Sequence, residues 1–318
     1  MQRPEFALAI HGGAGTLTRS TMTPEQETEY RTTLHLAMVA GQACLASGQH
    51  ALDAVCAAVA VMEDSPLFNA GRGAVFTHEG HNEMDAAVMV GQGRDAGAVC
   101  QITGIKNPVL AARAVMEKSN HVMLAGAGAR AFAEDAGLET APAEYFHTEA
   151  RYQQLLAVRD SNAAVLDHDG AHKLAFADKK FGTVGAVALD RFGQLAAATS
   201  TGGLTNKRWG RIGDSPVIGA GTWADDKVAI SGTGTGEVFL RACAAHEISA
   251  RMRYLNEDAA TAAAAVMAEL GTMGGQGGLI VIDAQGHITL PFNTEGMYRG
   301  QLVAGGEIEV AIYRDSES

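Results

Sequence analysis

Pairs of short, continuously apolar segments most constrain how this chain can fold. Residues 183–189 read T-V-G-A-V-A-L, and a turn containing Gly193 joins them to a second apolar segment at 195–201. A strand without a polar face must be buried on both sides, so its sheet is covered on both faces. Because expected strands and expected helices each occur in neighbouring pairs, the pattern disfavours a doubly wound parallel sheet. It predicts an α+β protein built as a four-layer αββα sandwich.

The expected elements follow from apolar periodicity and turn residues. Thr23 is expected to cap the first helix, because Pro24 suits the first helical position and Gln26 completes a capping box. Further helices are expected at 52–62, 108–118, twice before residue 160, at 237–254 and up to residue 270. Strands are expected at 6–10, 74–77, 85–90, 97–103, 122–124, 183–189, 195–201, 228–231, 278–282, 287–290 and 307–313.

Composition bounds the class of protein. The chain has 318 residues, of which 47% are hydrophobic and 38 are glycine, so layers packed by small residues are expected. A net charge of −12 without a basic run makes nucleic acid an unexpected partner. We expect no membrane span, because no long uncharged apolar run is present. The four scattered cysteines and the missing signal peptide favour the cytoplasm.

Residues 161–182 differ in character from the segments on either side. Asp, His, Lys and Gly dominate, and apolar periodicity is weak. The segment exceeds the ~12–15 residues usual for a loop without its own structure, which calls for an explanation. We interpret it as a flexible connection.

Thr183 begins an apolar strand directly behind Gly182 and the flexible segment. One interpretation is a β-branched residue that starts a strand. The other is a hidden N-terminal nucleophile: if the Gly182–Thr183 bond were cut, Thr183 would carry both a hydroxyl and a free amine. An α-amine with a pKa of about 7.7–8.0 is a workable base for that hydroxyl. Gly182 would let the chain bend at the cleaved bond.

Two further motifs carry charge or backbone donors. Arg211 and Asp214 form either a surface salt bridge, worth ~0–1 kcal/mol, or a clamp for the carboxylate and ammonium of an amino acid. The glycine-rich run 232–237 lies between an expected strand and an expected helix, where backbone N–H groups bind anions. A nucleotide phosphate is disfavoured, because the run lacks a lysine and ends in Glu237. An oxyanion hole fits better.

Together these motifs resemble the plant-type (class 3) L-asparaginases, which are also isoaspartyl (β-aspartyl) peptidases and belong to the N-terminal-nucleophile hydrolases. The resemblance covers almost the whole chain, and the order and separation of the motifs make it specific. The matching segments are H-G-G-A-G at 11–15, P-L-F-N-A-G at 66–71, N-P at 107–108, G-T-V-G-A-V-A at 182–188, T-S-T-G-G at 199–203, G-R-I-G-D at 210–214, G-T-G-T-G-E at 232–237 and P-F-N-T-E-G-M at 291–297.

The resemblance implies a single domain, residues 1–318, that cuts itself before Thr183 into an α subunit (1–182, with a flexible tail at about 161–182) and a β subunit (183–318). It assigns further roles within the site. Thr183 would be the nucleophile and Thr201 would orient its hydroxyl. The other implied site residues are Thr233 and the Gly234 N–H for the oxyanion, Arg211 and Asp214 for the substrate, Gly236 lining the site, and Asn69 near the scissile bond.

The family's sodium-binding loop corresponds to residues 62–72. A structural sodium would be held there through backbone oxygens near Met62, Glu63, Ser65, Phe68, Ala70 and Arg72, and no cofactor is expected for catalysis. The charge of Arg72 within this loop departs from the family pattern. Trp209 beside the clamp is a second departure, and we expect it to narrow or shape the pocket.

The implied activity is hydrolysis of the β-amide of L-aspartyl compounds. The expected substrates are isoaspartyl (β-aspartyl) dipeptides and L-asparagine, the product is L-aspartate, and the expected assembly is a homodimer of αβ units. Two alternatives stay open: an N-glycosyl-asparagine amidase of the same superfamily, and an amino-acid-binding protein that is never processed.

Overall fold

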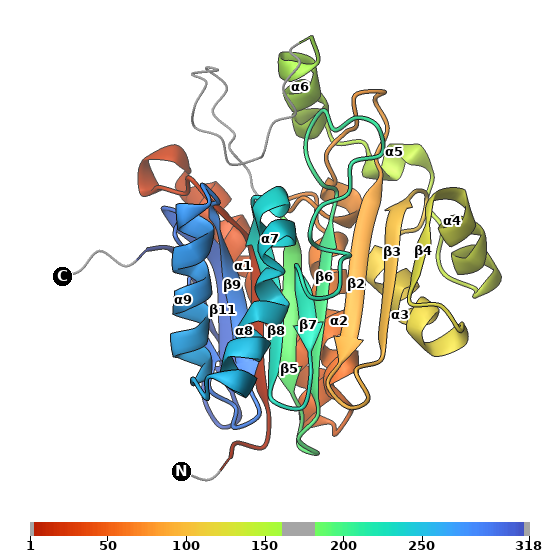
Figure 1. The fold of residues 1–318 in the computed structure, drawn as a ribbon. Helices are drawn as coiled ribbons and strands as arrows, with labels where there is room; N and C mark the ends of the chain where they lie inside the picture. The colour runs from red at the N-terminus through yellow and green to blue at the C-terminus, as the bar shows by residue number, and fades with distance from the viewer. Residues whose placement is uncertain (1–2, 161–181, 315–318) are drawn as a thin grey trace.

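The computed structural model describes residues 3–160 and 182–314 (Figure 1). Two sheets organise this part of the chain, an eight-stranded one in the order β12-β11-β1-β5-β6-β2-β3-β4 and a four-stranded one in the order β10-β9-β8-β7. Neighbouring strands pair antiparallel except β3 with β4. The strands are β1 (Ala7–Gly15), β2 (Met84–Val90), β3 (Ala96–Ile102), β4 (Met123–Ala125), β5 (Val184–Leu189), β6 (Leu195–Thr201), β7 (Thr222–Ala224), β8 (Val228–Gly234), β9 (Gly277–Asp283), β10 (Ile288–Thr289), β11 (Gly296–Val303) and β12 (Glu309–Tyr313).

Helices flank the sheets. The α-helices are α1 (Pro24–Ala46), α2 (Ala51–Glu63), α3 (Pro108–Lys118), α4 (Gly126–Asp135), α5 (Ala143–Phe146), α6 (Glu149–Val158), α7 (Gly236–Ala242), α8 (Ala244–Tyr254) and α9 (Ala259–Thr272). The predicted cap of α1 is confirmed: the Gln26 backbone N–H donates to the Thr23 hydroxyl (3.2 Å), and the Thr23 N–H donates to the Gln26 side chain (3.0 Å). Within residues 3–160 and 182–314, no helix is long and apolar enough to cross a membrane.

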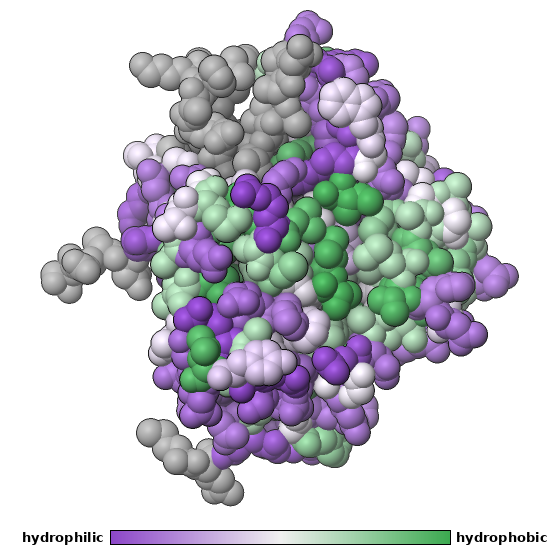
Figure 2. All heavy atoms as spheres, in the orientation of Figure 1, coloured by the Kyte–Doolittle hydropathy of each residue, from purple (hydrophilic) through white to green (hydrophobic). Residues whose placement is uncertain are grey.

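The sheets and helices pack in a fixed order. Helices α1, α2 and α3 lie against one face of the larger sheet, and β8 and β9 lie against β1, β5 and β6 on its other face. Helices α8 and α9 cover the smaller sheet, as Figure 1 shows. Apolar side chains also gather over β2 and β3, next to the smaller sheet (Figure 2). The chain therefore has the expected α+β class.

The alternation of side chains along β5 shows why its apolar sequence requires two covered faces. Val184, Ala186 and Ala188 join the hydrophobic core shared with α1, α2 and α3. Val187 and Leu189 point the other way and join the core that contains β8, β9 and the outer helices. Full burial of a valine or leucine side chain stabilises the fold by about 1.5–3 kcal/mol. Both faces of β5 thus contribute to folding.

Several predicted elements are wrong in detail. Residues 74–77 are a loop rather than a strand, because their N–H groups bond to loop partners such as the side-chain oxygen of Asn69. The expected helix 237–254 is broken at Cys243, whose φ of 47° is left-handed, into α7 and α8. Three helices, α4, α5 and α6, replace the two expected before residue 160. The strands β7 and β11 were not expected.

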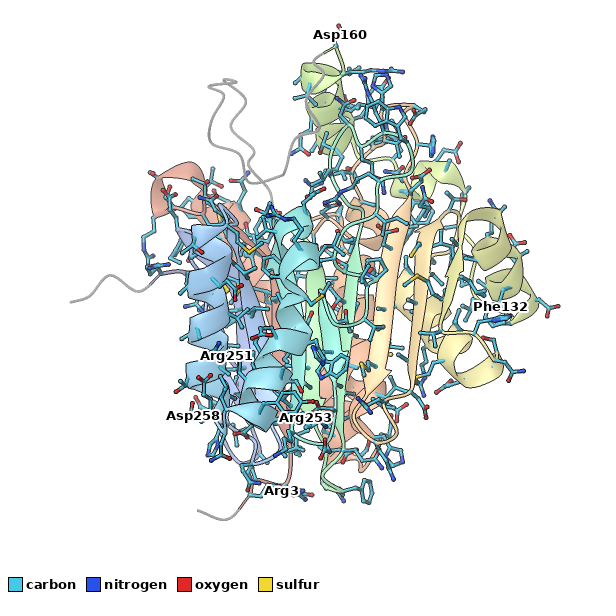
Figure 3. The ribbon with its side chains drawn as sticks, viewed as in Figure 1. Arg3, Phe132, Asp160, Arg251, Arg253 and Asp258 are labelled. Carbon is cyan, nitrogen blue, oxygen red and sulfur yellow. The ribbon has the colours of Figure 1, made fainter. Side chains whose placement is uncertain are left out.

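One end of the molecule holds the start of β5 and the ends of β6 and β8. Antiparallel pairing places Val184 of β5 opposite Ser200 of β6 at this end. Asp160, the last described residue before position 182, lies at the top of Figure 3, and Arg3 lies at the bottom. Apart from Gly182, the expected flexible tail at 161–182 lies outside the described residues.

Candidate active site

A small cleft lies where β5 begins and β6 and β8 end. It brings together residues that are far apart in the sequence, including seven of the predicted site residues. Its lining consists of Asn69, Gly182, Thr183, Thr201, Gly203, Leu204, Arg211, Gly213, Asp214, Ser215 and Gly234. Two predicted residues, Thr233 and Gly236, do not line the cleft but lie directly behind it.

The hydroxyls of Thr183 and Thr201 contact each other across the cleft. Thr183 Oγ1 donates to Thr201 Oγ1 over 3.1 Å. Thr201 Oγ1 also accepts from the Gly203 backbone N–H at 3.0 Å, which holds the acceptor in place. The antiparallel pairing of β5 with β6 produces this proximity, because it places the residue before β5 beside the last residue of β6. The predicted orientation of the Thr183 hydroxyl by Thr201 is compatible with this geometry.

Gly182 adopts a backbone conformation that glycine alone accepts without strain. Its φ is +90°, and a Cβ at this position would lie 2.6 Å from the Cα of Gly13 in β1. The same Cβ would lie 3.2 Å from Thr233 Oγ1. Gly182 is buried, so the chain passes between β1 and the end of β8 with no room for a side chain.

The two residues of the predicted clamp do not pair with each other. Arg211 instead donates to both carboxylate oxygens of Glu237, from Nε at 2.9 Å and from Nη2 at 3.0 Å. Gly236 lies between the clamp residues: a Cβ there would be 2.8 Å from Arg211 Nη2 and 3.0 Å from Asp214 Oδ1. Arg211 and Asp214 therefore share one wall of the cleft, and Arg211 pairs with Glu237 instead of with Asp214.

Asp214 is buried and incompletely hydrogen-bonded. Its Oδ2 has no hydrogen-bond partner among the described residues. Burial raises the pKa of Asp214 to about 7, and the nearby Arg211 only partly offsets this effect. A buried carboxylate with a vacant acceptor can bind a cationic donor such as an ammonium group.

Ser215 and Glu237 are site residues that the sequence reasoning missed. The Ser215 hydroxyl is buried in the cleft wall and has no hydrogen-bond partner among the described residues. A small polar residue directly after the clamp carboxylate was the available signal. Glu237 was considered only as a charge that repels phosphate, so its pairing with Arg211 was not anticipated.

Trp209 does not shape the cleft as expected. Its side chain is 95% exposed, its φ is +56°, and it is absent from the lining residues. The turn from Arg208 to Arg211, closed by a backbone hydrogen bond of 3.1 Å, directs the ring into solvent. The expectation that Trp209 narrows the pocket is therefore wrong.

Asn69 fastens the loop after α2 to the strand that carries Thr201. Its Nδ2 donates to the Gly203 carbonyl (2.8 Å) and its backbone carbonyl accepts from the Gly202 N–H (2.9 Å). Its Oδ1 accepts from the Val75 N–H at 3.0 Å. The side-chain amide therefore uses both of its polar atoms to hold the cleft wall.

The candidate oxyanion residues lie at the end of β8. The Thr233 hydroxyl is fully buried and has no hydrogen-bond partner within the described parts of the chain. Gly234 packs against β9 so closely that a Cβ would lie 2.2 Å from the Gln276 carbonyl oxygen. The Thr233 hydroxyl would lie 3.2 Å from a Cβ built on Gly182, so it is a donor placed beside the Gly182–Thr183 bond. Its predicted role in oxyanion binding stays a prediction.

The loop at 62–72 presents backbone oxygens, the ligand type that a sodium ion takes. A Cβ on Gly71 would lie 2.3 Å from the Glu63 carbonyl oxygen, and one on Gly73 would lie 2.0 Å from that of Phe68. Arg72 is exposed, with its guanidinium over the Tyr145 ring at 5.5 Å, so its charge points away from these oxygens. The carbonyls of Met62, Phe68 and Ala70 accept backbone N–H groups in or directly after this segment, at 3.3 Å, 2.9 Å and 3.1 Å. The sodium site through backbone oxygens stays a prediction.

Comparisons with known proteins support the motif assignment. The sequence profile of the asparaginase family matches residues 4–312. The isoaspartyl peptidase of Escherichia coli K12 is 53% identical over 310 residues, which cover 97% of this chain and 96% of that protein. A probable isoaspartyl peptidase/L-asparaginase 2 of Arabidopsis thaliana is 38% identical (97% and 99% covered). A plant-type L-asparaginase of Pyrobaculum calidifontis is 42% identical (92% and 95% covered).

Proposed function

Since the chain belongs to the asparaginase family, we propose that it hydrolyses the β-amide bond of isoaspartyl dipeptides and of L-asparagine and releases L-aspartate. The observation that carries this proposal is the 3.1 Å contact between the Thr183 and Thr201 hydroxyls in a cleft that also holds Arg211 and Asp214. These residues supply a nucleophile, a partner for a substrate carboxylate and a partner for its ammonium. Relatives named isoaspartyl peptidase support the same reaction.

We also propose that the packing of helices and sheets is the four-layer αββα fold of an N-terminal-nucleophile hydrolase. In such a protein the nucleophile is the first residue of a chain freed by self-cleavage. The proposed α subunit is 1–182 and the β subunit is 183–318. The tight, buried turn at Gly182 supports this division, because it places the Gly182–Thr183 bond close to the hydroxyls of Thr183 and Thr233.

Maturation proceeds by an N-to-O acyl shift at Thr183. Thr183 Oγ1 attacks the Gly182 carbonyl carbon, the C–N bond to Thr183 breaks, and the nitrogen takes up the hydroxyl proton to become an amine. Water then hydrolyses the resulting ester, which frees the Gly182 carboxylate and restores the Thr183 hydroxyl. The Thr233 hydroxyl is close enough to the Gly182 turn to stabilise the negative oxygen of the intermediate.

Turnover repeats this chemistry on the substrate. Arg211 binds the α-carboxylate and Asp214 binds the α-ammonium, so the β-carbonyl is held against Thr183. The Thr183 amine accepts the proton of its own hydroxyl as Oγ1 attacks, and the leaving amine takes that proton as the amide bond breaks. Water cleaves the β-aspartyl ester and releases aspartate. Thr233 and the Gly234 N–H bind the oxyanion, where losing one donor typically costs ~10²–10³ in rate.

Three further expectations join this proposal. A sodium ion held by carbonyls of residues 62–72 would stiffen the loop that contains Asn69, and it would take no part in bond breaking. Two αβ units would associate into a homodimer, which light scattering on the purified protein tests. The cytoplasm stays the expected compartment.

Intact mass, N-terminal sequencing and a substrate assay test the proposed function together. The wild type should yield two chains, one starting at Thr183, and should release aspartate from a β-aspartyl dipeptide. Thr183→Ala should stay as one species near 33.1 kDa with no hydrolysis. Faster turnover of a glycosylated asparagine would favour the amidase alternative, and an intact wild type that only binds amino acids would favour the binding protein.

A further inference from the structure

A row of polar side chains crosses the buried space between the two sheets, just below the cleft. In the larger sheet, His11 of β1 lies opposite Gly185 of β5, which lies opposite Thr199 of β6. In the smaller sheet, Ser231 of β8 lies opposite Thr222 of β7. The four polar residues are fully buried, beside a core of aliphatic, methionine and aromatic side chains. Burying polar groups beside such a core costs folding free energy unless each group forms a hydrogen bond.

These side chains form one continuous hydrogen-bonded chain. His11 Nδ1 lies 3.0 Å from the Thr183 carbonyl oxygen, and His11 Nε2 lies 2.9 Å from Ser231 Oγ. Ser231 Oγ lies 2.7 Å from Thr199 Oγ1, which lies 2.6 Å from Thr222 Oγ1. The chain therefore begins at the backbone of Thr183 and passes through three hydroxyls.

The far end of the chain reaches the substrate-binding wall. Thr222 Oγ1 lies 2.9 Å from the backbone carbonyl oxygen of Ser215, the residue that follows Asp214. The single proton of the Thr222 hydroxyl is donated either to this carbonyl or to Thr199 Oγ1, and not to both at once. The Gly221 N–H beside Thr222 donates to the Asp214 carbonyl at 3.1 Å. The nucleophile and the clamp are therefore connected through side chains of four strands and, at the clamp end, through the Gly221 N–H that bonds the Asp214 carbonyl.

The partners of His11 fix which ring nitrogen carries the proton. A carbonyl oxygen can only accept, so Nδ1 must be protonated to bond Thr183. Nε2 then accepts from the Ser231 hydroxyl, which in turn accepts from Thr199. Burial lowers the pKa of His11 to about 3, so the ring stays neutral at physiological pH. One tautomer therefore satisfies both contacts.

Gly185 makes room for the row. A Cβ on Gly185 would lie 2.1 Å from Ser231 Oγ and 2.4 Å from His11 Nε2. The second residue after Thr183 must therefore be glycine for the histidine and the serine to meet. The close packing at Gly185 holds the start of β5 against His11 of the larger sheet and Ser231 of the smaller sheet.

We propose that His11 is a positioning residue for Thr183, and that the Ser231–Thr199–Thr222 hydroxyl chain holds the nucleophile at a fixed distance from the Asp214–Ser215 wall. This inference rests on the proposed function, because it assigns the row a part in the same reaction. The Nδ1–H bond fixes the plane of the Thr183 carbonyl, and that plane sets the direction of the amine and hydroxyl on the same Cα. Misplacing reacting groups by about 1 Å can cost ~10² in rate.

Two matched pairs of variants test the positioning role. His11→Asn places an amide donor where Nδ1 lies, whereas His11→Leu has similar bulk and no donor. Thr199→Ser keeps the middle hydroxyl, whereas Thr199→Val keeps the shape and removes it. Rates are divided by the concentration of chains that start at Thr183, so incomplete maturation does not lower the measured kcat.

We expect kcat for a β-aspartyl dipeptide to fall about 10- to 100-fold in His11→Leu, with KM within about threefold of wild type. His11→Asn should recover most of the loss. Thr199→Val should lower kcat about tenfold, and Thr199→Ser should stay within about twofold. A residue that merely supports folding would change the melting temperature and leave kcat per mature chain unchanged. Equal kcat in Thr199→Val and Thr199→Ser would overturn the proposal.

Nitrogen NMR on histidine-labelled protein tests the tautomer without any substrate. The His11 signals are identified by their loss in His11→Asn. We expect a proton on Nδ1, an unprotonated Nε2 and no titration between pH 8 and pH 5. A proton on Nε2, or titration in this range, contradicts the inference. A wild type that shows the expected tautomer but hydrolyses no β-aspartyl substrate would refute the proposed function instead.

Discussion

Arg211 donates two parallel hydrogen bonds to the carboxylate of Glu237, from Nε at 2.9 Å and from Nη2 at 3.0 Å. This bidentate arrangement fixes the plane of the guanidinium within the cleft wall. It also occupies one edge of the group, so a substrate carboxylate must bind the donors that remain. Glu237 follows the glycine-rich turn at 232–236, which explains how one loop reaches both the candidate oxyanion hole and the clamp.

Removing Glu237 should therefore weaken substrate binding without slowing the chemistry. In Glu237→Ala, Arg211 regains rotamer freedom, and we expect KM to rise about tenfold with kcat within about twofold of wild type. Glu237→Gln keeps one oxygen acceptor for the guanidinium, so its KM should stay within about threefold. Steady-state kinetics on a β-aspartyl dipeptide give both constants. A lower KM in Glu237→Ala would mean that the carboxylate competes with substrate rather than orients Arg211.

The site residues that could be predicted from the sequence are those that belong to short motifs of consecutive residues. The motifs around Thr183, Thr201 and Arg211 all lie in one cleft, because each sits at the end of a strand or in the loop that follows. The Arg211–Glu237 pair was missed since it joins a loop to the first turn of α7, and the proximity of these segments depends on the sheet. Partners at that sequence distance become visible only when the strand order is known.

Asp214 should give the reaction a pH dependence that differs between free and substrate-bound protein. Its pKa of about 7 means that it becomes protonated below pH 7, and it then loses the charge that attracts an ammonium. The Thr183 amine, with an ordinary pKa of about 7.7–8.0, also takes up a proton as pH falls. We therefore expect log kcat/KM to fall with a slope near 2 below pH 7. The bound ammonium lowers the pKa of Asp214, so log kcat should fall with a slope near 1.

Asp214→Asn separates the protonation of Asp214 from the protonation of the Thr183 amine. The amide keeps the size of the side chain but loses one charge-assisted interaction worth about 1.5–3 kcal/mol, so kcat/KM should drop roughly 10- to 150-fold. The slope of log kcat/KM below pH 7 should fall from 2 to 1, because a single titrating group is left. An unchanged slope in this variant would show that Asp214 does not titrate in the working range.

Glu63 should make the folded state less stable as pH rises. Its side chain is fully buried, and its Oε1 accepts from the Ser200 hydroxyl (2.6 Å) and the Val109 N–H (3.0 Å). Burial raises its pKa from 4.5 to about 8, so the folded state holds a proton that the unfolded state releases between these values. Stability contributed by this proton is fully present below pH 4.5 and is lost as pH rises to about 8.

Glu63→Gln tests this effect, because an amide keeps the Oε1 acceptor and cannot ionise. We expect the melting temperature of the variant relative to wild type to increase from pH 5 to pH 8 and to stay constant above pH 8. Thermal unfolding at half-unit pH steps measures the difference. A constant difference over this range would show that Glu63 has the same pKa in the folded and unfolded chain.

The remaining errors of the sequence reasoning have local physical causes. The helix expected at 237–254 carries no proline or internal glycine, so nothing in its sequence indicates the left-handed Cys243 that separates α7 from α8. Strand β11 begins at Gly296 and contains a second glycine and an arginine, which obscure its alternation. Its pairing with β1, visible in the register of Ala7 with Val303, supplies the stability that its composition does not indicate.

Gly182→Ala should slow maturation. The substitution forces an L side chain into a φ of +90° and places a methyl group 2.6 Å from the Gly13 Cα. The backbone must shift, and the Gly182 carbonyl then moves away from the Thr183 hydroxyl that attacks it. We expect the uncut chain to dominate after expression, whereas the wild type is cut, as measured by denaturing gel electrophoresis and intact mass over time.

Gly80→Ala provides the matched control for this prediction. Gly80 has a similar φ of +86°, yet a Cβ there meets no atom within 4 Å among the described residues. It therefore carries the same backbone strain without the steric conflict, and its loop lies outside the cleft lining. Normal cutting of Gly80→Ala beside an uncut Gly182→Ala would assign the defect to the close approach of Gly182 and Gly13. Equally fast cutting of both variants would show that the tight turn before Thr183 is not needed for self-cleavage.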